Sequence, residues 1–366
     1  MHIPGYLVLS LALTALATGC VGIPETYTST DRIVSNRGDP ATLTKIHLDS
    51  NVYTLVAGSD AVWLGPDMEP LFGNTNILRV DPSEHRVAAI IPTRGNFFLT
   101  MAIGEDAVWA PSSGRLYRIG RNRDEIVAEI PLFGYSEGIA VGEGAVWVGH
   151  GGKVSRVDTN SNSVVAEIST GRNTWDRIAA GEGSVWVLKM SDGVVYRIDP
   201  LKNEVVAGIQ LGPPYTDNFY SILQRRGVWH GLAELGWASQ TAYWVPYKSI
   251  AAGEGAVWVT RGAERESAVL RIDPRSNKLV AEISLPGDPE SVTTHAGYVW
   301  VSDGSKLVRV NPDSNKVDDV ITIPSGRDCP TAHGTIAAAG DSLWFLQSTR
   351  PERPTNEACL WRVEFD

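Results

Sequence analysis

The chain has 366 residues, of which 43% are hydrophobic and 20% are charged, and its formal net charge is −10. This is the composition of a globular protein with enough chain for a sizeable core. The negative charge, with no Lys/Arg run longer than Arg225-Arg226, excludes a nucleic-acid partner, because phosphate backbones bind basic surfaces.

The N-terminal segment predicts export. Tyr6 to Ala17 is an apolar run of 12 residues, which is too short for a membrane-spanning helix of ~20 residues and typical of the core of a signal peptide. The small residues that lead into Cys20 resemble the lipobox of bacterial lipoproteins, in which cleavage leaves the cysteine as a lipid-modified N-terminus. The alternative is a plain secretory signal.

Residues 1–19 are therefore expected to be a signal peptide. Residues 20–41 are expected to be a lipidated Cys20 and a flexible tether, because this segment is polar and aperiodic. A flexible chain of that length reaches roughly 25 Å. Together these features predict an exported protein at the bacterial cell envelope, in the periplasm or on the outer surface, that touches a membrane only through its lipid anchor.

A short sequence motif, here called the phrase, recurs along the rest of the chain. Its full form is Gly-Glu-Gly-Ala-Val-Trp147, and it ends in tryptophan seven times, at Trp63, Trp109, Trp147, Trp186, Trp258, Trp300 and Trp344. The spacings between these tryptophans are 46, 38, 39, 72, 42 and 44 residues. A repeat of about 40 residues is typical of a β-propeller, one blade per repeat. The long spacing holds one blade plus about 30 extra residues, too few for another blade, so seven blades are predicted.

Each repeat divides into four short strands. In one unit they are expected at 178–180, 184–187, 194–199 and 204–209, where hydrophobic residues alternate and β-branched residues are frequent. Asp199-Pro200 with Asn203 predicts the hairpin turn before the fourth strand, since proline fixes φ and Asn tolerates the left-handed region.

The two ends of the chain complete each other. The chain stops in the third strand of its last blade, at 361–364, and a spare strand is available at 44–48. One blade built from both termini closes the ring and leaves no open sheet edge. The predicted fold is therefore an all-β, seven-bladed β-propeller of four-stranded blades over residues 42–366, closed by an N-terminal strand that completes the last blade.

The cysteines predict one disulfide. If Cys20 is acylated, the pair Cys329 and Cys359 is left in an oxidising compartment. The repeat places Cys329 in the loop entering the last blade and Cys359 at the start of that blade's third strand, which emerge on the same face. The alternative is two free buried thiols.

Residues 250–283 carry a resemblance to known propellers. Their sequence reads Ile-Ala-Ala-Gly-Glu-Gly-Ala-Val-Trp-Val-Thr and then Val-Leu-Arg-Ile-Asp-Pro-Arg-Ser-Asn-Lys-Leu-Val-Ala-Glu-Ile. It resembles the YVTN-type bacterial propellers and the streptogramin (virginiamycin B) lyases. The similarity covers about 42–364. The lyase resemblance implies catalysis by His and Glu near the channel with a divalent metal such as Mg. Those lyases place a Glu just after the second strand, where this chain has His150, Arg261 and Asp303.

Candidate site residues are those that break the repeat on the face carrying the second-to-third-strand loops and the inter-blade loops. For catalysis the candidates are Glu137, His150 and His333. An aromatic-rich insertion at about 211–248 is expected on the same face, as a cap or as a plug of the channel. Arginines there suit an anionic or polyhydroxyl ligand. The ligand-binding candidates are Arg94, Arg172, Trp175, Trp229, Trp237, Trp244, Arg261 and Arg327.

The sequence favours a monomeric, non-catalytic binding or scaffold module without a cofactor or a resident metal, holding a small molecule, a glycan or an envelope protein on the insert-bearing face. The first alternative is a streptogramin-lyase-like, metal-dependent enzyme. The second is a quinone- or sugar-oxidising propeller with its cofactor stacked over the channel.

Overall fold

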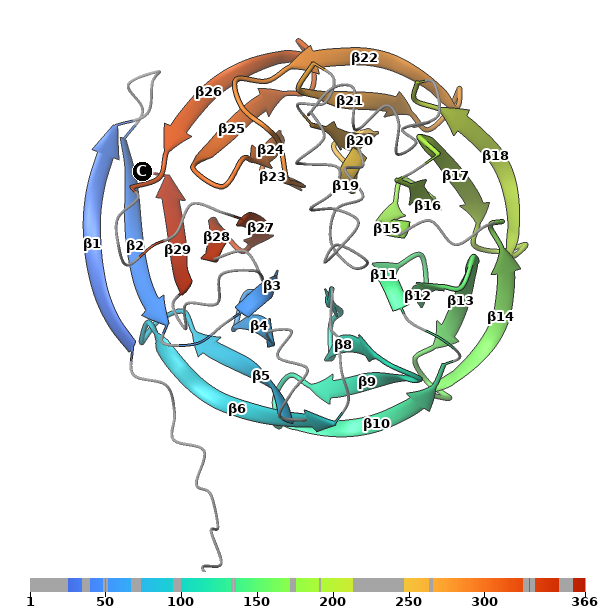
Figure 1. The fold of residues 1–366 in the computed structure, drawn as a ribbon, viewed down its shortest axis with the longest axis horizontal. Coiled ribbons are helices and arrows are strands. Elements are labelled where there is room, and N and C mark those ends of the chain that lie inside the picture. Colours follow the sequence, from blue (N-terminus) through green and yellow to red (C-terminus); the bar gives the residue numbers. More distant parts are fainter. Residues whose placement is uncertain are drawn as a thin grey trace, which may run out of the picture.

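The computed structural model describes residues 26–34, 40–48, 50, 52–66, 74–94, 100–132, 134, 136–171, 176–190, 192–212, 247–262, 266–324, 329, 333–348 and 358–365. Over these residues the regular elements are all β-strands, grouped in seven antiparallel sheets around a central axis (Figure 1). The predicted all-β, seven-bladed propeller is confirmed. None of the described segments forms a helix that is long and apolar enough to span a membrane.

Six blades are four-stranded meanders whose strands we call a to d from the axis outward. Blades 1 to 3 comprise β3 (Val52–Ala57), β4 (Val62–Pro66), β5 (Asn74–Asp81), β6 (Arg86–Arg94), β7 (Ala102–Ile103), β8 (Ala107–Ser112), β9 (Arg115–Gly120), β10 (Glu125–Pro131), β11 (Ser136–Gly142), β12 (Ala145–His150), β13 (Lys153–Asp158) and β14 (Ser163–Ser169). Blades 4 to 6 comprise β15 (Asp176–Gly181), β16 (Ser184–Lys189), β17 (Val194–Asp199), β18 (Glu204–Gln210), β19 (Tyr247–Gly253), β20 (Ala256–Arg261), β21 (Ala268–Asp273), β22 (Lys278–Ser284), β23 (Ser291–His295), β24 (Tyr298–Ser302), β25 (Lys306–Asn311) and β26 (Lys316–Thr322).

The meander gives the propeller two different faces. The b–c loops and the d–a connections between blades lie on one face, here called the loop face. The a–b and c–d turns lie on the other, here called the turn face. The strands of blade 4 occupy the predicted positions and extend them by at most two residues at an end. Of the predicted insertion at 211–248, residues 213–246 lie outside the described residues, and Tyr247 begins β19, where its side chain is buried against Leu211 and Met190.

Blade 7 joins the two ends of the chain. It contains β27 (His333–Ala339), β28 (Ser342–Ser348), β29 (Ala358–Phe365), β2 (Pro40–Leu48) and β1 (Thr26–Val34), in that order from the axis. The predicted closure is confirmed, because β2 pairs with β29 and sets His47 opposite Cys359 (Figure 1).

Blade 7 has a fifth strand, which lies within the segment 20–41 that the sequence predicts to be a flexible tether. Thr26–Val34 pairs with β2 along nine residues as β1. Threonine and tyrosine favour strands, and without β1 the strand β2 would present an unpaired edge. Cys20 and the predicted signal peptide lie outside the described residues.

The repeated Trp and Arg side chains join neighbouring blades. The Trp147 ring is buried, and its Nε1 donates to Gly142 O at 3.0 Å. The Arg156 guanidinium lies 5.4 Å from the centre of that ring and donates to Pro200 O and Asn203 Oδ1 of the next blade, at 2.8 and 3.0 Å. The same contacts recur at Arg118, Arg197 and Arg271. These repeated residues therefore hold the scaffold together.

The Gly-Glu-Gly phrase forms the a–b turn and a second link between blades. Glu143 and Gly144 both have positive φ, 51° and 76°, as a tight hairpin turn of this kind requires. Glu143 Oε1 then accepts a hydrogen bond from Gly183 N of the next blade at 3.1 Å, and the same link recurs from Glu182 and Glu254. This hydrogen bond between blades explains why the phrase carries an acidic residue.

The predicted disulfide is confirmed. Cys329 and Cys359 are bonded, with their Cα atoms 5.5 Å apart and both side chains buried. The bond ties the segment before β27 to strand β29 of the closing blade.

Replacing a turn aspartate by asparagine is expected to reduce acid sensitivity. The pKa of Asp199 lies below its ordinary value because the backbone N–H groups of Lys202 and Leu201 donate to its carboxylate. A lowered folded-state pKa contributes stability that is present above the unfolded-state value and lost as the pH falls through the folded one. Asn311 accepts the same two backbone bonds in blade 6, so Asp199→Asn keeps the turn and removes the titration.

Thermal melts between pH 6 and pH 2.5 test this expectation. Asp199→Asn should lose less melting temperature on acidification than the parent chain does. Asp313→Asn, at the exposed tip of the blade 6 turn, is the control and should follow the parent. Equal acid sensitivity of the parent and Asp199→Asn would contradict the expectation.

Candidate functional site

The repeat stops three residues after each phrase tryptophan, where strand b reaches the loop face. We call these seven places the rim positions. They are occupied by Pro66, Ser112, His150, Lys189, Arg261, Asp303 and Gln347. The scaffold before them is nearly constant while their chemistry differs in every blade, as expected where function is carried by the ends of rigid elements. The resemblance to the lyases points to His150, Arg261 and Asp303, and the same three-residue offset from the tryptophan identifies the other four positions.

His150 lies between blades 2 and 3. It shares a face of β12 with Val148, two residues earlier, and Val148 packs against Trp109 and Leu116 of blade 2. The His150 side chain is 4% exposed, and its Nε2 shares a 2.6 Å hydrogen bond with Ser155 Oγ. This histidine is therefore held by its own blade, at the end of a strand and not in a loop.

The other two catalytic candidates lie on strands of type a. Glu137 stands at an irregularity of β11, where Ser136 pairs with His150 and Gly138 with Gly149. His333 begins β27 of blade 7, which lies across the axis from β11 (Figure 1). The structure thus sets Glu137 next to the strand of His150 and places His333 in a distant blade. The side chains of Glu137 and His333 lie outside the described residues.

A buried hydroxyl lies beside His150. Ser136 is directly opposite His150 in the strand register, so the two side chains share one face of the blade. The Ser136 Oγ is buried and makes no hydrogen bond with any described residue. An unpaired buried hydroxyl costs free energy, which makes it a candidate to bond a ligand.

Lys189 forms an ion pair inside the loop face. Its Nζ lies 2.8 Å from Asp176 Oδ2, and each side chain is 1% exposed. The same Nζ donates to Thr170 Oγ1 of blade 3 at 3.3 Å, so the pair lies between blades 3 and 4. Removing both charges from water is expensive, and a hydrophobic pair of similar volume would often be as stable. The pair therefore fixes the geometry of this part of the rim at a cost in stability.

The Arg261 side chain is bonded to other residues of blade 5. Its Nη1 lies 3.0 Å from Glu282 Oε2, its Nη2 contacts Glu282 Oε1, and its Nε donates to Glu266 O at 3.0 Å. The hydrogen bonds from Arg261 lower the pKa of Glu282. A ligand would reach this arginine only by sharing it with Glu282, so its assignment as a ligand contact stays a prediction.

Arg94 lies farther from the axis than the rim. It is exposed and ends β6, the outermost strand of blade 1, where its carbonyl oxygen accepts a hydrogen bond from the Tyr117 hydroxyl. The remaining ligand-binding candidates, Arg172, Trp175, Trp229, Trp237, Trp244 and Arg327, lie outside the described residues.

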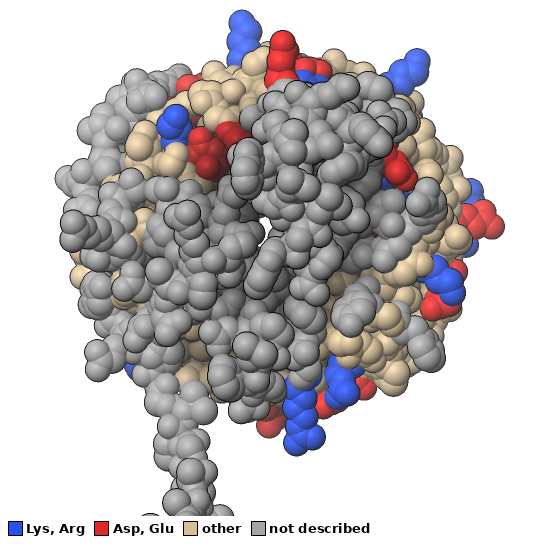
Figure 2. Space-filling model, viewed as in Figure 1, with Lys and Arg blue, Asp and Glu red and all other residues tan. Residues whose placement is uncertain are grey.

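Blade 6 is the acidic part of the loop face. Figure 2 shows acidic side chains gathered over β24 and β25 on this face. Asp288 lies 2.9 Å from Lys248 Nζ, Glu290 accepts from Gly334 N at 2.9 Å, and Asp303 accepts from the N–H of Lys306 at 2.7 Å. Within the described segments, no three His, Cys, Asp or Glu side chains form a group that could hold a metal ion.

Comparison with known proteins supports the fold. No protein-family model and no curated protein sequence matches the chain. Among solved structures, a chain of hydrazine synthase from Kuenenia stuttgartiensis is similar, with a TM-score of 0.61 and 11% sequence identity, covering 81% of this chain and 93% of that one. A likeness at this identity shows the β-propeller architecture and carries no activity across.

Proposed function

We propose that this protein is an exported, lipid-anchored propeller that binds a polar ligand or an envelope partner on its loop face. The observation that carries the proposal is the set of rim positions. Seven blades repeat one scaffold, and each ends at the loop face in a different side chain, several of them buried and polar. A scaffold without a binding role would have no need of this variation.

The chemistry of the rim favours a ligand with several polar groups. The pairs Lys189–Asp176 and Arg261–Glu282 place charges of both signs on blades 4 and 5. The Ser136 hydroxyl is unbonded among the described residues, and Asp288 and Asp303 place carboxylates on blade 6. A glycan or a cell-wall peptide presents hydroxyl, amide and charged groups that such a face could bond together. The disulfide and the predicted signal peptide support an oxidising, exported setting.

The second candidate function is a lyase of the streptogramin type. It is favoured by His150, which stands at the rim position where the resemblance expects a catalytic residue, beside the strand that carries Glu137. This candidate requires a divalent metal for turnover, whereas the binding module requires none.

The test is a thermal-shift screen of the protein against muropeptides, glycans, cyclic peptide antibiotics and divalent metals. A ligand that binds only the folded state raises the melting temperature. We expect a rise with a glycan or a cell-wall peptide and an unchanged response in the presence of a chelator. A rise with metals alone, together with chelator-sensitive turnover of a streptogramin, would favour the lyase. No rise with any probe would contradict binding of a small polar ligand and the lyase, and would point to a protein partner.

Ser136→Ala is expected to weaken binding without weakening the fold. The variant removes a buried hydroxyl that has no bond among the described residues, so the melting temperature should be unchanged or slightly higher. If the hydroxyl bonds the ligand, affinity should fall about 5- to 10-fold, as measured by calorimetric titration. Ser163→Ala, on the turn face of the same blade, is the control and should bind as the parent does. Equal affinity of the two variants would remove Ser136 from the site.

A further inference from the structure

The turn face carries one residue that the repeat does not explain. The third residue of each c–d turn lies at the tip of the turn, and in five of six blades its side chain is polar. In chain order the six residues are Ser83, Asn122, Asn160, Leu201, Arg275 and Asp313. Leu201 is the apolar member, and it is 88% exposed.

The fold of the turn does not need a leucine at this place. Asp199 Oδ1 accepts the N–H groups of Leu201 and Lys202 at 2.9 and 3.1 Å, and Asn203 supplies the positive φ of 56°. The neighbouring Asp and Asn therefore set the turn, as they do in blade 5. Replacing an exposed leucine at such a tip costs nothing in packing. Leu201 is a candidate for an external contact because it lies beside other apolar side chains that line a hollow.

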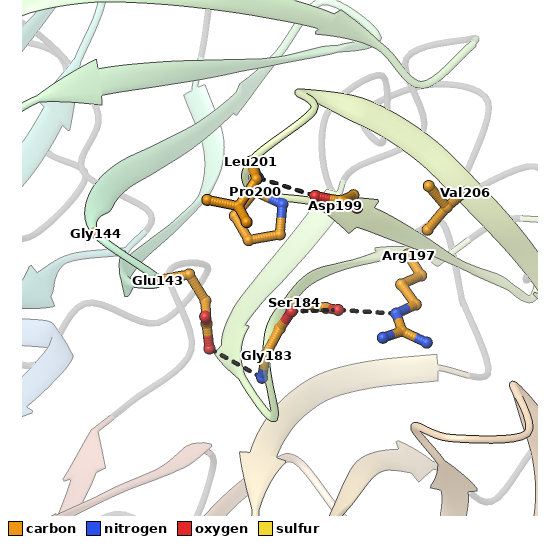
Figure 3. Close-up of a pocket in the computed structure, with 9 residues that line it drawn as sticks. All are labelled: Glu143, Gly144, Gly183, Ser184, Arg197, Asp199, Pro200, Leu201 and Val206. Atoms are coloured by element: carbon orange, nitrogen blue, oxygen red, sulfur yellow. Dashed lines mark hydrogen bonds between the residues drawn. The ribbon is translucent and has the colours of Figure 1, made fainter.

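Leu201 stands at the edge of a hollow of about 560 Å³ on the turn face (Figure 3). Pro200 and Val206 line the hollow together with Leu201, and the carboxylates of Glu143 and Asp199 lie around the same space. Val206 is half exposed because it occupies the bulge of β18, between the paired residues Val205 and Ala207. The hollow thus combines an apolar wall with negative charge.

The guanidinium of Arg197, which lines this hollow, already makes hydrogen bonds within the protein. Arg197 Nε donates to Ser184 Oγ at 2.8 Å, and its Nη1 donates to Pro274 O and Asn277 Oδ1 of blade 5. Glu143 Oε1 accepts from Gly183 N, and Glu143 Oε2 is left for an external donor, since a carboxylate accepts at both oxygens. The hollow therefore favours a cationic group.

The equivalent hollow of blade 2 has different chemistry. It is about 420 Å³ and is lined by Arg118, Arg121 and Arg123 beside Asp106, with Asn122 in place of the leucine. The repeat geometry creates a hollow in both blades, and only the blade 4 version joins an exposed leucine to carboxylates. Its character is therefore a property of these particular residues and not of the repeat.

We infer that the blade 4 hollow is a docking site for a partner protein segment that places an aliphatic side chain beside a lysine or arginine. The aliphatic group would pack on Leu201 and Val206, and the cation would lie by Glu143, because Asp199 already lies 3.5 Å from Lys202 Nζ. Charge complementarity supports this occupant, because the chain has a net charge of −10. The same carboxylates would repel an anionic bilayer. The site lies on the face opposite the proposed ligand site and does not depend on it.

The test is selection of a random seven-residue peptide library on the full-length protein, with subtraction on Leu201→Ser. Enriched peptides should pair Leu, Ile or Val with Lys or Arg at neighbouring positions. Measured by fluorescence anisotropy, their affinity should fall about tenfold or more in Leu201→Ser. It should also fall in Glu143→Gln and on adding salt, because the charge contact is exposed. Arg275→Ser, the same turn position in blade 5, is the control and should bind as the parent does.

Several results would overturn the inference. These are no enrichment over Leu201→Ser, enrichment of acidic peptides, or a Leu201-dependent dimer in sedimentation, which would make the surface a self-contact. Leu201-dependent binding to phosphatidylglycerol vesicles would also overturn it, since it would assign the surface to a membrane. Binding of cell-wall probes on the loop face should be the same in Leu201→Ser and the parent, so the two proposals fail separately.

Discussion

Replacing Lys189 by methionine is expected to lower the free energy of unfolding by about 3–5 kcal/mol, since removing one partner leaves a buried charge with fewer bonds. Lys189 and Asp176 are each 1% exposed and lie 2.8 Å apart. Methionine fills a similar volume, so the loss would come from the Asp176 carboxylate and not from a cavity. Urea unfolding followed by tryptophan fluorescence measures the change.

A double variant separates charge from packing. Lys189→Met with Asp176→Leu removes both charges and should recover most of the stability, because a hydrophobic pair often equals or exceeds a buried ion pair. Lys202→Met is the control, as Lys202 lies 3.5 Å from Asp199 with 66% of its side chain exposed, and its loss should cost at most about 1 kcal/mol. A Lys189→Met variant as stable as the control would show that the pair contributes little.

The same pair connects stability with the proposed site. Asp176 begins strand a and Lys189 ends strand b of blade 4, so their bond fixes both strands where they reach the loop face. The double variant should therefore keep the fold while loosening this part of the rim. If the rim binds a ligand, the double variant should bind more weakly although its melting temperature is close to that of the parent.

The architecture could be predicted because its signal is repeated and local. The tryptophan phrase marks strand b seven times, and Asp199 with Asn203 marks a turn by backbone chemistry that acts within five residues. Ring closure followed from counting strands, since one was missing at the end and one was spare at the start. The addition of β1 could not be predicted in this way, because its pairing with β2 has no counterpart in the other six blades.

The role of the rim residues was harder to predict because it depends on which partners their side chains meet on neighbouring strands. His150 and Arg261 were recognised as departures from the repeat. Their engagement by Ser155 and Glu282 depends on which side chains face each other across strands. Sequence therefore indicates where the chemistry changes, and the fold decides whether a polar group is free or already bonded.

Breaking the Cys329–Cys359 bond is expected to cost about 3.5 kcal/mol of stability, as the chain-entropy model gives for a closed loop of this length. The two cysteines are 30 residues apart. Replacing both by alanine, or reducing the parent chain, should lower the melting temperature by a similar amount, because the same cross-link is lost. A reduced parent that melts at the temperature of the oxidised one would contradict this expectation.

The effect should be larger when the N-terminal strands are also removed. Strand β29 is held to blade 7 by hydrogen bonds to β28 and β2 and by the disulfide through Cys359. A chain lacking residues 1–49 keeps β29 anchored while the bond is intact, so its oxidised form should stay folded with reduced stability. Without β2 the strand β29 is an edge strand, and on reduction it also loses the disulfide that restrains it. Such edges favour aggregation. The combined loss should therefore exceed the sum of the two separate losses, measured by thermal melts of all four species, because β2 and the disulfide restrain the same strand.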